Sequence, residues 1–392
     1  MNRPAWARWV TRISLILALI ALVITIRDIG PVTLAEYFER IGWWWIAVAV
    51  LEVAITSLDA VAIRSFLSPE QARVGLRAAL LSQLAGRAVN AVTPSGNLGE
   101  AVKVSVLVEH VSQSRAVSTI LLYNAVSFSV ELLVVAVAVP FVILFVPLPS
   151  VLCWMMIVTC VVSFALVAVL YTLVRRGALT ALAPIARWLY VLAARLARRP
   201  GYAFPAERYE RWQRSLAAVA DQMRVSAGAR RRDRWLGIAA VVASRLTSMS
   251  LSFMILHAVG ESLTPGFVAA YTVGGFIIYM SSSLVPMGVG ISEGGNYALF
   301  RALGENPARG VTLVLARRVT QIVYAAIGLV LMTASETVQR ARERHRTRSA
   351  ASDLPAPPAA TPLDAGPRMA ASSVATPGPA TPGTPTASSL TG

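Results

Sequence analysis

Two polar interruptions break otherwise apolar stretches of this sequence, at residues 93–100 (TPSGNLGE) and 286–293 (PMGVGISE). Each contains a proline, at least one glycine, and a glutamate six or seven residues after the proline. In hydrocarbon the backbone N–H and C=O groups freed by such a break find no water, so the break persists only where it lines a protein-enclosed or wet cavity. Matched breaks in two halves of a membrane chain indicate the substrate site of a transporter.

Composition supports an integral membrane protein. The 392 residues are 56% hydrophobic and 14% charged, whereas soluble domains carry about 25% charged residues. The net charge is +16, and Lys103 is the only lysine among the 36 basic residues. Because the arginines flank apolar segments, the positive charge indicates an anionic membrane surface and not a nucleic-acid partner.

Six apolar segments are long enough to cross a hydrocarbon layer of about 30 Å as helices. They lie at residues 9–26, 43–63, 118–144, 151–174, 235–259 and 311–334. The two interrupted stretches, 74–108 and 265–303, are interpreted as re-entrant helical hairpins. The predicted fold is therefore an all-α polytopic membrane protein with about six full spans and two inverted re-entrant hairpins.

Arginine clusters predict the topology. They occur at the amino terminus, in the connection 178–234 and at 340–348, and the positive-inside rule places all three in the cytoplasm. This predicts a multi-pass membrane protein with both termini cytoplasmic and hairpins entering from opposite faces. Aligning Glu100 with Glu293 also aligns Asn124 with Arg317 and Glu131 with Tyr324, which is consistent with an inverted repeat of span, hairpin and span.

The chain is expected to hold one structural domain, residues 1–340, followed by a disordered Ala/Pro/Thr-rich cytoplasmic tail at 341–392. Such a tail has too few large apolar residues to form a core. Within the domain, residues 178–234 form a basic cytoplasmic connection in which apolar residues at helical spacing predict an amphipathic helix on the inner leaflet.

No sequence motif indicates catalysis, a metal or a cofactor, because H-E-x-x-H, C-x-x-C and G-x-S-x-G elements do not occur in the sequence. Charged residues inside membrane spans are functional candidates by default. The guanidinium fork of arginine matches phosphate oxygens, and a helix that restarts after a break offers free N–H groups to an anion. The candidate substrate-binding residues are Glu52, Asp59, Asn90, Pro94, Gly96, Gly99, Glu100, Glu131, Arg245, Pro286, Gly288, Gly290, Glu293 and Arg317.

A structural alternative exists for each of these features. Intramembrane Arg–Glu pairs also stabilise helix packing, and Pro/Gly breaks also produce simple kinks. Asn90 is a candidate for satisfying freed backbone groups, and Arg115 is better explained as a topology anchor than as a ligand.

Several of these motifs resemble the lysylphosphatidylglycerol synthase transmembrane-region family, also called flippase-like integral membrane proteins. The resemblance covers roughly residues 13–334. It depends on Asn90, Pro94, Gly96, Gly99 and Glu100 in the first half, and on the run 286–293, Leu303-Gly304 and Arg317 in the second. It implies a module that moves or handles lipids with modified head groups in bacteria and archaea.

The chain also departs from that family's pattern. Full members carry a carboxyl-terminal domain that attaches lysine to phosphatidylglycerol, whereas only the Ala/Pro/Thr-rich tail follows here. Many relatives have a Glu-Arg pair and a later Asp in the third span, where this sequence has Tyr123, Asn124 and Glu131. We therefore do not expect synthase activity.

The sequence favours a lipid flippase-like transporter in which Arg245 and Arg317 hold phosphate, while Glu100 and Glu293 pair with these cations or with a head-group amine. Expected partners are membrane lipids with anionic or amine-modified head groups; lipid-biosynthesis enzymes are possible partners, and oligomerisation is left open. Two alternatives remain. One is a membrane-embedded transferase on a lipid-linked substrate, with Asp59 or Glu100 as base, and the other is a non-catalytic scaffold for envelope lipid synthesis.

Overall fold

The computed structural model describes residues 41–92, 98–146, 150–176, 206–227, 230–283, 290–324 and 326–328, with the single positions 39, 184, 188 and 330. All of them lie in the unit Met1–Gln339, and the remainder of the chain, Arg340–Gly392, forms a separate unit. The predicted span at 9–26, most of the connection 178–205 and the tail lie outside the described residues.

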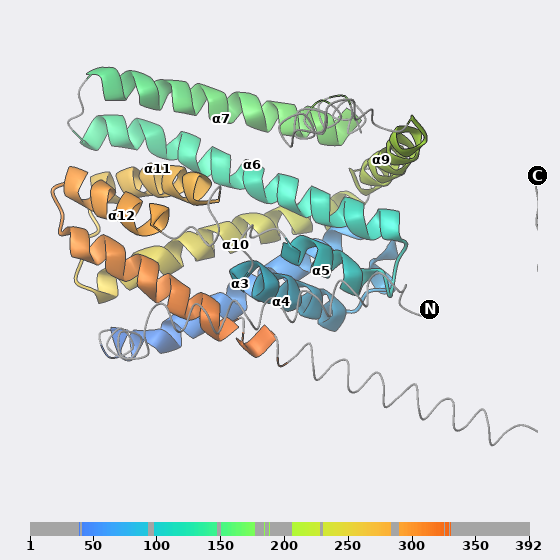
Figure 1. Ribbon diagram of the computed structural model, residues 1–392, viewed down its shortest axis with the longest axis horizontal. Helices are drawn as coiled ribbons and strands as arrows, with labels where there is room; N and C mark the ends of the chain where they lie inside the picture. Colours follow the sequence, from blue (N-terminus) through green and yellow to red (C-terminus); the bar gives the residue numbers. More distant parts are fainter. Residues whose placement is uncertain are drawn as a thin grey trace, which may run out of the picture. The chain divides into compact units, whose positions relative to one another are not determined.

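The described residues are helical and contain no strand. The helices are α3 (Trp44–Phe66), the 3-10 turn η1 (Glu70–Ala72), α4 (Leu76–Val92), α5 (Leu98–Leu107), α6 (Gln113–Phe145), α7 (Ser150–Arg176), α9 (Ala206–Ala227), α10 (Arg231–Ala258), α11 (Pro265–Ser282), α12 (Ile291–Ala302) and the helix Pro307–Gly328 (Figure 1).

Five of these helices are long and apolar enough to cross a membrane: Trp44–Phe66, Gln113–Phe145, Met156–Arg175, Arg231–Ala258 and Pro307–Gly328. They correspond to five of the six predicted spans, and the sixth lies outside the described residues. The all-α, multi-pass membrane fold is thus confirmed. Pro140 does not end α6, because neighbouring helices can compensate a lost backbone bond within a membrane protein.

Neither interrupted stretch is a continuous helix. In the first half α4 ends at Val92 and α5 begins at Leu98, and in the second half α11 ends at Ser282 and α12 begins at Ile291. At 1.5 Å per residue α5 is about 15 Å long and α12 about 18 Å long, so neither can cross a hydrocarbon layer of about 30 Å. The path of each pair relative to the membrane remains a prediction.

Helices α4 and α5 pack directly against each other, and Gly99 makes this close approach possible. A Cβ at Gly99 would lie 2.0 Å from the backbone oxygen of Gly86 and 2.4 Å from Oδ1 of Asn90. Oδ1 of Asn90 accepts a hydrogen bond from the Gly99 N–H at 2.6 Å. The asparagine therefore satisfies a backbone donor at the start of α5, as the structural interpretation of this residue expected.

Helices α3 and α10, one from each half of the chain, pack directly against each other (Figure 1). Helix α11 of the second half packs on α6 of the first. Conversely, α4 of the first half contacts a helix of the second half, Pro307–Gly328. There the guanidinium of Arg87 lies 5.4 Å from the ring centre of Tyr324. Helix α11 therefore lies against the span that follows α4 and α5, and α4 lies against the span that follows α11 and α12.

Arg115, interpreted from the sequence as a topology anchor, is completely buried. Its guanidinium donates to the backbone oxygens of Ser68 and Phe66, and to that of Gln222 in α9 at 3.1 Å. These bonds join the start of α6, the end of α3 and α9. The sequence did not show that α9 covers this residue, and its role as a topology anchor remains a prediction.

Two helices end in the same way and bring two carboxyl groups together. Gly260 and Gly304 adopt positive φ after α10 and α12, and the N–H groups of Glu261 and Glu305 donate to the oxygens of Leu256 and Phe300. This is the Schellman pattern of a glycine-terminated helix. Glu261 is buried, accepts from Arg309 at 3.0 Å and shares a hydrogen bond with Glu305. This bond, together with burial, raises the pKa of Glu305.

We expect Gly99→Ala to lower the free energy of unfolding by about 1–3 kcal/mol, because the methyl group would overlap the backbone of α4. The control is Gly294→Ala, where the added Cβ meets nothing within 4 Å and alanine is the better helix former. Denaturation of the detergent-solubilised protein measures both. Equal stability of the two variants would contradict the close α4–α5 packing.

We expect the contribution of the Glu261–Glu305 bond to stability to decrease as pH rises. A raised pKa in the folded state means that the folded protein retains the proton, so the contribution is complete below the pKa of unfolded glutamate and is lost as pH rises through the folded pKa. Thermal unfolding between pH 4 and 8 should therefore be less pH-dependent in Glu305→Gln than in the wild type. Parallel pH profiles would contradict the proton-sharing pair.

Candidate functional site

A buried polar cluster joins α3, α4, α6 and α10 around Asp59. The Asp59 side chain is 2% exposed. It accepts hydrogen bonds from Gln83 at 2.7 Å, from Ser244 at 2.6 Å and from Arg245 at 3.2 Å. Arg245 also donates to the hydroxyl of Tyr123 at 2.9 Å. Both oxygens of Asp59 are thereby satisfied, as a carboxylate held at membrane depth requires.

Arg245 is shared between two carboxylates. Its Nη2 binds Asp59, and its Nη1 lies 3.3 Å from Oε1 of Glu131 on α6. Glu131 is 28% exposed, compared with 2% for Asp59, and Arg245 is its only hydrogen-bonding partner among the described residues. The two acids thus differ, because Asp59 is fixed within the protein whereas Glu131 faces open space.

A second ion pair connects α3 to α4. Nη2 of Arg87 lies 2.6 Å from Glu52, and its Nη1 donates to Thr56 at 2.7 Å. Glu52 and Asp59 are seven residues apart on α3 and both are buried, as their helical spacing predicted. Glu52 therefore stabilises the packing of α4, which is the structural alternative considered for intramembrane pairs.

The start of α5 holds a third charged group. Glu100 accepts from Lys103 at 2.9 Å, from Asn124 on α6 at 2.9 Å and from Asn90 at 3.2 Å. These bonds attach the restarted helix to both α4 and α6. The lysine side chain is 5% exposed and also lies over the ring of Tyr123.

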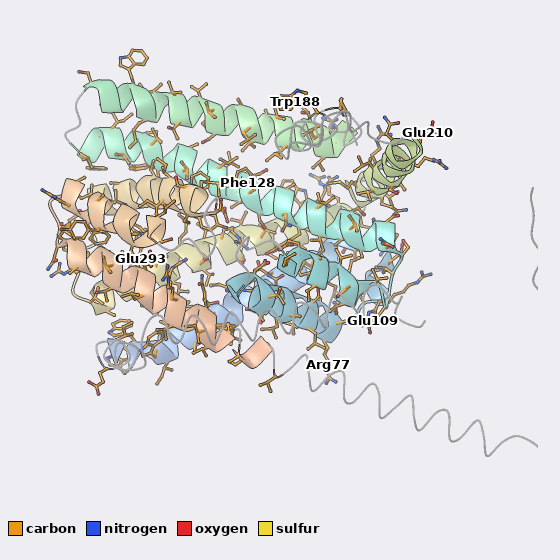
Figure 2. All side chains as sticks on the ribbon, viewed as in Figure 1. Arg77, Glu109, Phe128, Trp188, Glu210 and Glu293 are labelled. Atoms are coloured by element: carbon orange, nitrogen blue, oxygen red, sulfur yellow. The ribbon has the colours of Figure 1, made fainter. Side chains whose placement is uncertain are left out.

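Two cavities adjoin this polar cluster. The larger, about 580 Å³, is lined from both halves of the chain, by residues that include Asp59, Arg87, Glu100, Gln321 and Tyr279. The smaller, about 300 Å³, lies beside α10, α11 and the helix Pro307–Gly328. Four residues line both cavities: Glu131, Arg245, Ser248 and Tyr279. Figure 2 labels Phe128, which also lines the larger cavity and lies 6.4 Å from the ring centre of Phe276 on α11.

Arg317 lines the smaller cavity without a carboxylate partner among the described residues. Its Nη2 donates to the backbone oxygen of Ser248 at 3.0 Å and to the hydroxyl of Ser252. The Nε atoms of Arg317 and Arg245 are both buried and have no acceptor in the described part of the chain. One cavity is therefore lined by two guanidinium groups, of which Arg317 has only neutral partners among the described residues, and guanidinium groups bind anionic oxygens strongly.

Glu293 differs from Glu100, with which the sequence alignment paired it. Its carboxylate accepts from the N–H of Gly290 at 2.8 Å and pairs with Arg318. Glu293 thus caps the start of α12 and attaches it to the neighbouring helix Pro307–Gly328, which it adjoins in Figure 2. The residue paired with Glu293 is Arg318 and not Arg317, because one position along a helix rotates a side chain by about 100°.

The structure brings together Glu52, Asp59, Asn90, Gly99, Glu100, Glu131, Arg245 and Arg317 near the two cavities. Gly290 and Glu293 lie at the start of α12. Pro94, Gly96, Pro286 and Gly288 lie outside the described residues. Three residues of the central cluster were not selected from the sequence, namely Gln83, Tyr123 and Ser244. Gln83 precedes Arg87 by one helical turn, which was the available signal.

No group of three or more His, Cys, Asp or Glu residues that could hold a metal ion occurs among the described residues. Comparison with known proteins gives one family match: the family described as lysylphosphatidylglycerol synthase TM region matches residues 9–328. No curated protein and no solved structure matches the chain.

Replacement of the two arginines should separate their roles. Arg245→Ala leaves Asp59 and Glu131 without their cation and should cost about 3–5 kcal/mol of stability. Arg317→Ala leaves only Ser248 and Ser252, which already bond to each other at 3.4 Å, so the cost should be about 1 kcal/mol. Denaturation measures both. Adding Asp59→Asn should restore part of the stability that Arg245→Ala loses, because it removes the unpaired charge. A larger loss for Arg317→Ala than for Arg245→Ala would contradict this assignment.

Proposed function

The chain belongs to the lysylphosphatidylglycerol synthase TM-region family, and we propose that it is a flippase-like transporter of lipids with phosphate-containing head groups in a bacterial inner membrane. Family membership connects this membrane protein with lipid handling. The observation that carries the finer proposal is the smaller cavity, which both Arg245 and Arg317 line and in which Arg317 has no carboxylate partner among the described residues.

The size and position of the cavities support a head-group path. Together they offer space in the range of about 300–1,000 Å³ that small-molecule sites occupy, and they adjoin at Glu131 and Arg245. Phosphate would bind the two arginines, and a head-group amine would bind Glu131. The acyl chains would remain in the surrounding lipid, because only the polar head group needs a route through the hydrocarbon.

The arrangement of the halves supports alternating access. One helix of each broken pair packs on the span that follows the other pair: α11 on α6, and α4 on the helix Pro307–Gly328. An inverted repeat would produce this exchange of partners. With the arginine-rich segments cytoplasmic, α4–α5 would close the chamber on the cytoplasmic side and α11–α12 would close it on the opposite side.

The transferase alternative finds less support. Asp59 has both oxygens bonded to Gln83, Ser244 and Arg245. Both oxygens of Glu100 are also occupied, by Asn90, Lys103 and Asn124. A general base needs an oxygen within reach of the proton that it removes, and Asp59, which is 2% exposed, offers none. This favours transport over transfer chemistry.

Reconstitution in liposomes tests the proposal. Head-group-labelled phosphatidylglycerol, phosphatidylethanolamine and an uncharged glycolipid are scored for leaflet accessibility with a membrane-impermeant reductant. We expect the phosphate lipids to cross at least tenfold faster than in empty vesicles, and Arg317→Gln to lose most of this rate because the anion loses one of its two cations.

The matched control is Arg301→Gln, which removes an exposed arginine that lines neither cavity and should retain wild-type transport. Crossing no faster than in empty vesicles would refute transport. Chemical conversion of a lipid would instead indicate a transferase. Wild-type rates in Arg317→Gln would remove the assigned phosphate site.

A further inference from the structure

We propose that Glu131 is a proton-coupling site, so that an anionic head group crosses the membrane together with one proton bound by this carboxylate. The inference rests on the proposed transport function and extends it to the energy source. It is carried by the balance of charges around the cavities and by the way in which Glu131 is held.

The charges around the larger cavity do not pair completely. Three ion pairs form there: Glu52 with Arg87, Glu100 with Lys103, and Asp59 with Arg245. Glu131 is the fourth carboxylate, and among the described residues it finds only the Arg245 that Asp59 already uses. The remaining cation, Arg317, lines the smaller cavity with Glu131 and is the one assigned to the phosphate. Once an anion occupies Arg317, Glu131 is the carboxylate left without a cation of its own, which is costly at membrane depth, so it is the group at which a proton is most easily accommodated.

Glu131 is also the acid that a substrate would disturb. Asp59 retains Gln83 and Ser244 when Arg245 turns to another anion, whereas Glu131 would lose its only described partner. A phosphate bound between Arg245 and Arg317 places a new negative charge in the cavity that Glu131 lines. Repulsion between the two anions favours the protonated form of Glu131. Binding of the anion and uptake of the proton therefore promote each other, as linkage requires.

The other charged and titratable groups around Glu131 do not replace it in this role. The groups that face the cavities around it are Asp59 on α3, Arg87 on α4, Glu100 and Lys103 on α5, Tyr123 on α6, Arg245 on α10, Tyr271 and Tyr279 on α11 and Arg317 on the helix Pro307–Gly328. The other two carboxylates in this set are each bonded to at least three donors. The tyrosines are already neutral, and the lysine and arginines already carry their protons, so none of these groups takes up a further proton.

The coupled species is electrically neutral when the head group carries one negative charge. A pH difference of one unit should then drive about a tenfold difference in lipid concentration between the leaflets, while a membrane potential should have little effect. An anion that crosses without a proton should respond to the membrane potential and not to the pH difference. Each 100 mV of potential supplies about 2.3 kcal/mol per charge moved. The two forms of transport are thus distinguishable in the same vesicles.

The experiment uses the reconstituted full chain with labelled phosphatidylglycerol, imposed pH differences, and potassium diffusion potentials. In parallel, a pH indicator measures proton uptake when dioctanoyl-phosphatidylglycerol is added to the purified protein in weak buffer. We expect accumulation driven by pH and not by potential, and uptake approaching one proton per bound lipid. Glu131→Gln should abolish the proton uptake and the dependence on pH, whereas Glu210→Gln, an exposed residue of α9, should keep both.

Three outcomes are decisive. Lipid movement or binding in the wild type with no proton uptake overturns the assignment of Glu131 and leaves the transport function intact. Proton uptake that persists in Glu131→Gln, with lipid still bound, also overturns it. A wild-type protein that neither binds nor moves any phosphate lipid refutes the proposed function, and this inference with it.

Discussion

The need to pair charge inside a membrane determines how the described helices are arranged. An unpaired ion at membrane depth is costly, so each acid or base within a span requires a partner on another helix. Arg245 on α10 meets this requirement for α3 and α6 at once, through Asp59 and Glu131. The pairs Glu52–Arg87 and Glu293–Arg318 join further helices in the same way. The positions of α3, α4, α6, α10 and α12 are therefore mutually constrained by charge.

Where pairing is incomplete, the protein has space next to it. Arg317 has only neutral partners among the described residues, and Glu131 shares its cation, and both line the smaller cavity. Incomplete pairing would be a stability defect in a protein whose only task was to pack. Next to a cavity that both halves of the chain contribute to, it leaves capacity for a charged ligand and for a proton.

The breaks in the helices have both a structural and a functional consequence. Asn90 and Glu293 each satisfy a backbone N–H at a restarting helix, so neither residue needs a substrate to explain its presence. Glu100 has three donors and attaches α5 to its neighbours. These side chains thus hold the starts of α5 and α12 in place, while Arg245, Arg317 and Glu131 line the smaller cavity.

Apolar length, arginine placement and the Pro/Gly breaks determined from the sequence alone that this is a multi-pass helical membrane protein with two interrupted segments. They also identified Asp59, Glu131, Arg245 and Arg317, because ionised residues are conspicuous in apolar spans. Only the tertiary structure decided which charge meets which, since a rotation of one residue about a helix axis exchanges Arg317 for Arg318 at Glu293. Neutral members such as Gln83, Tyr123 and Ser244 gave no comparable signal, because their part in the cluster depends entirely on how neighbouring helices face one another.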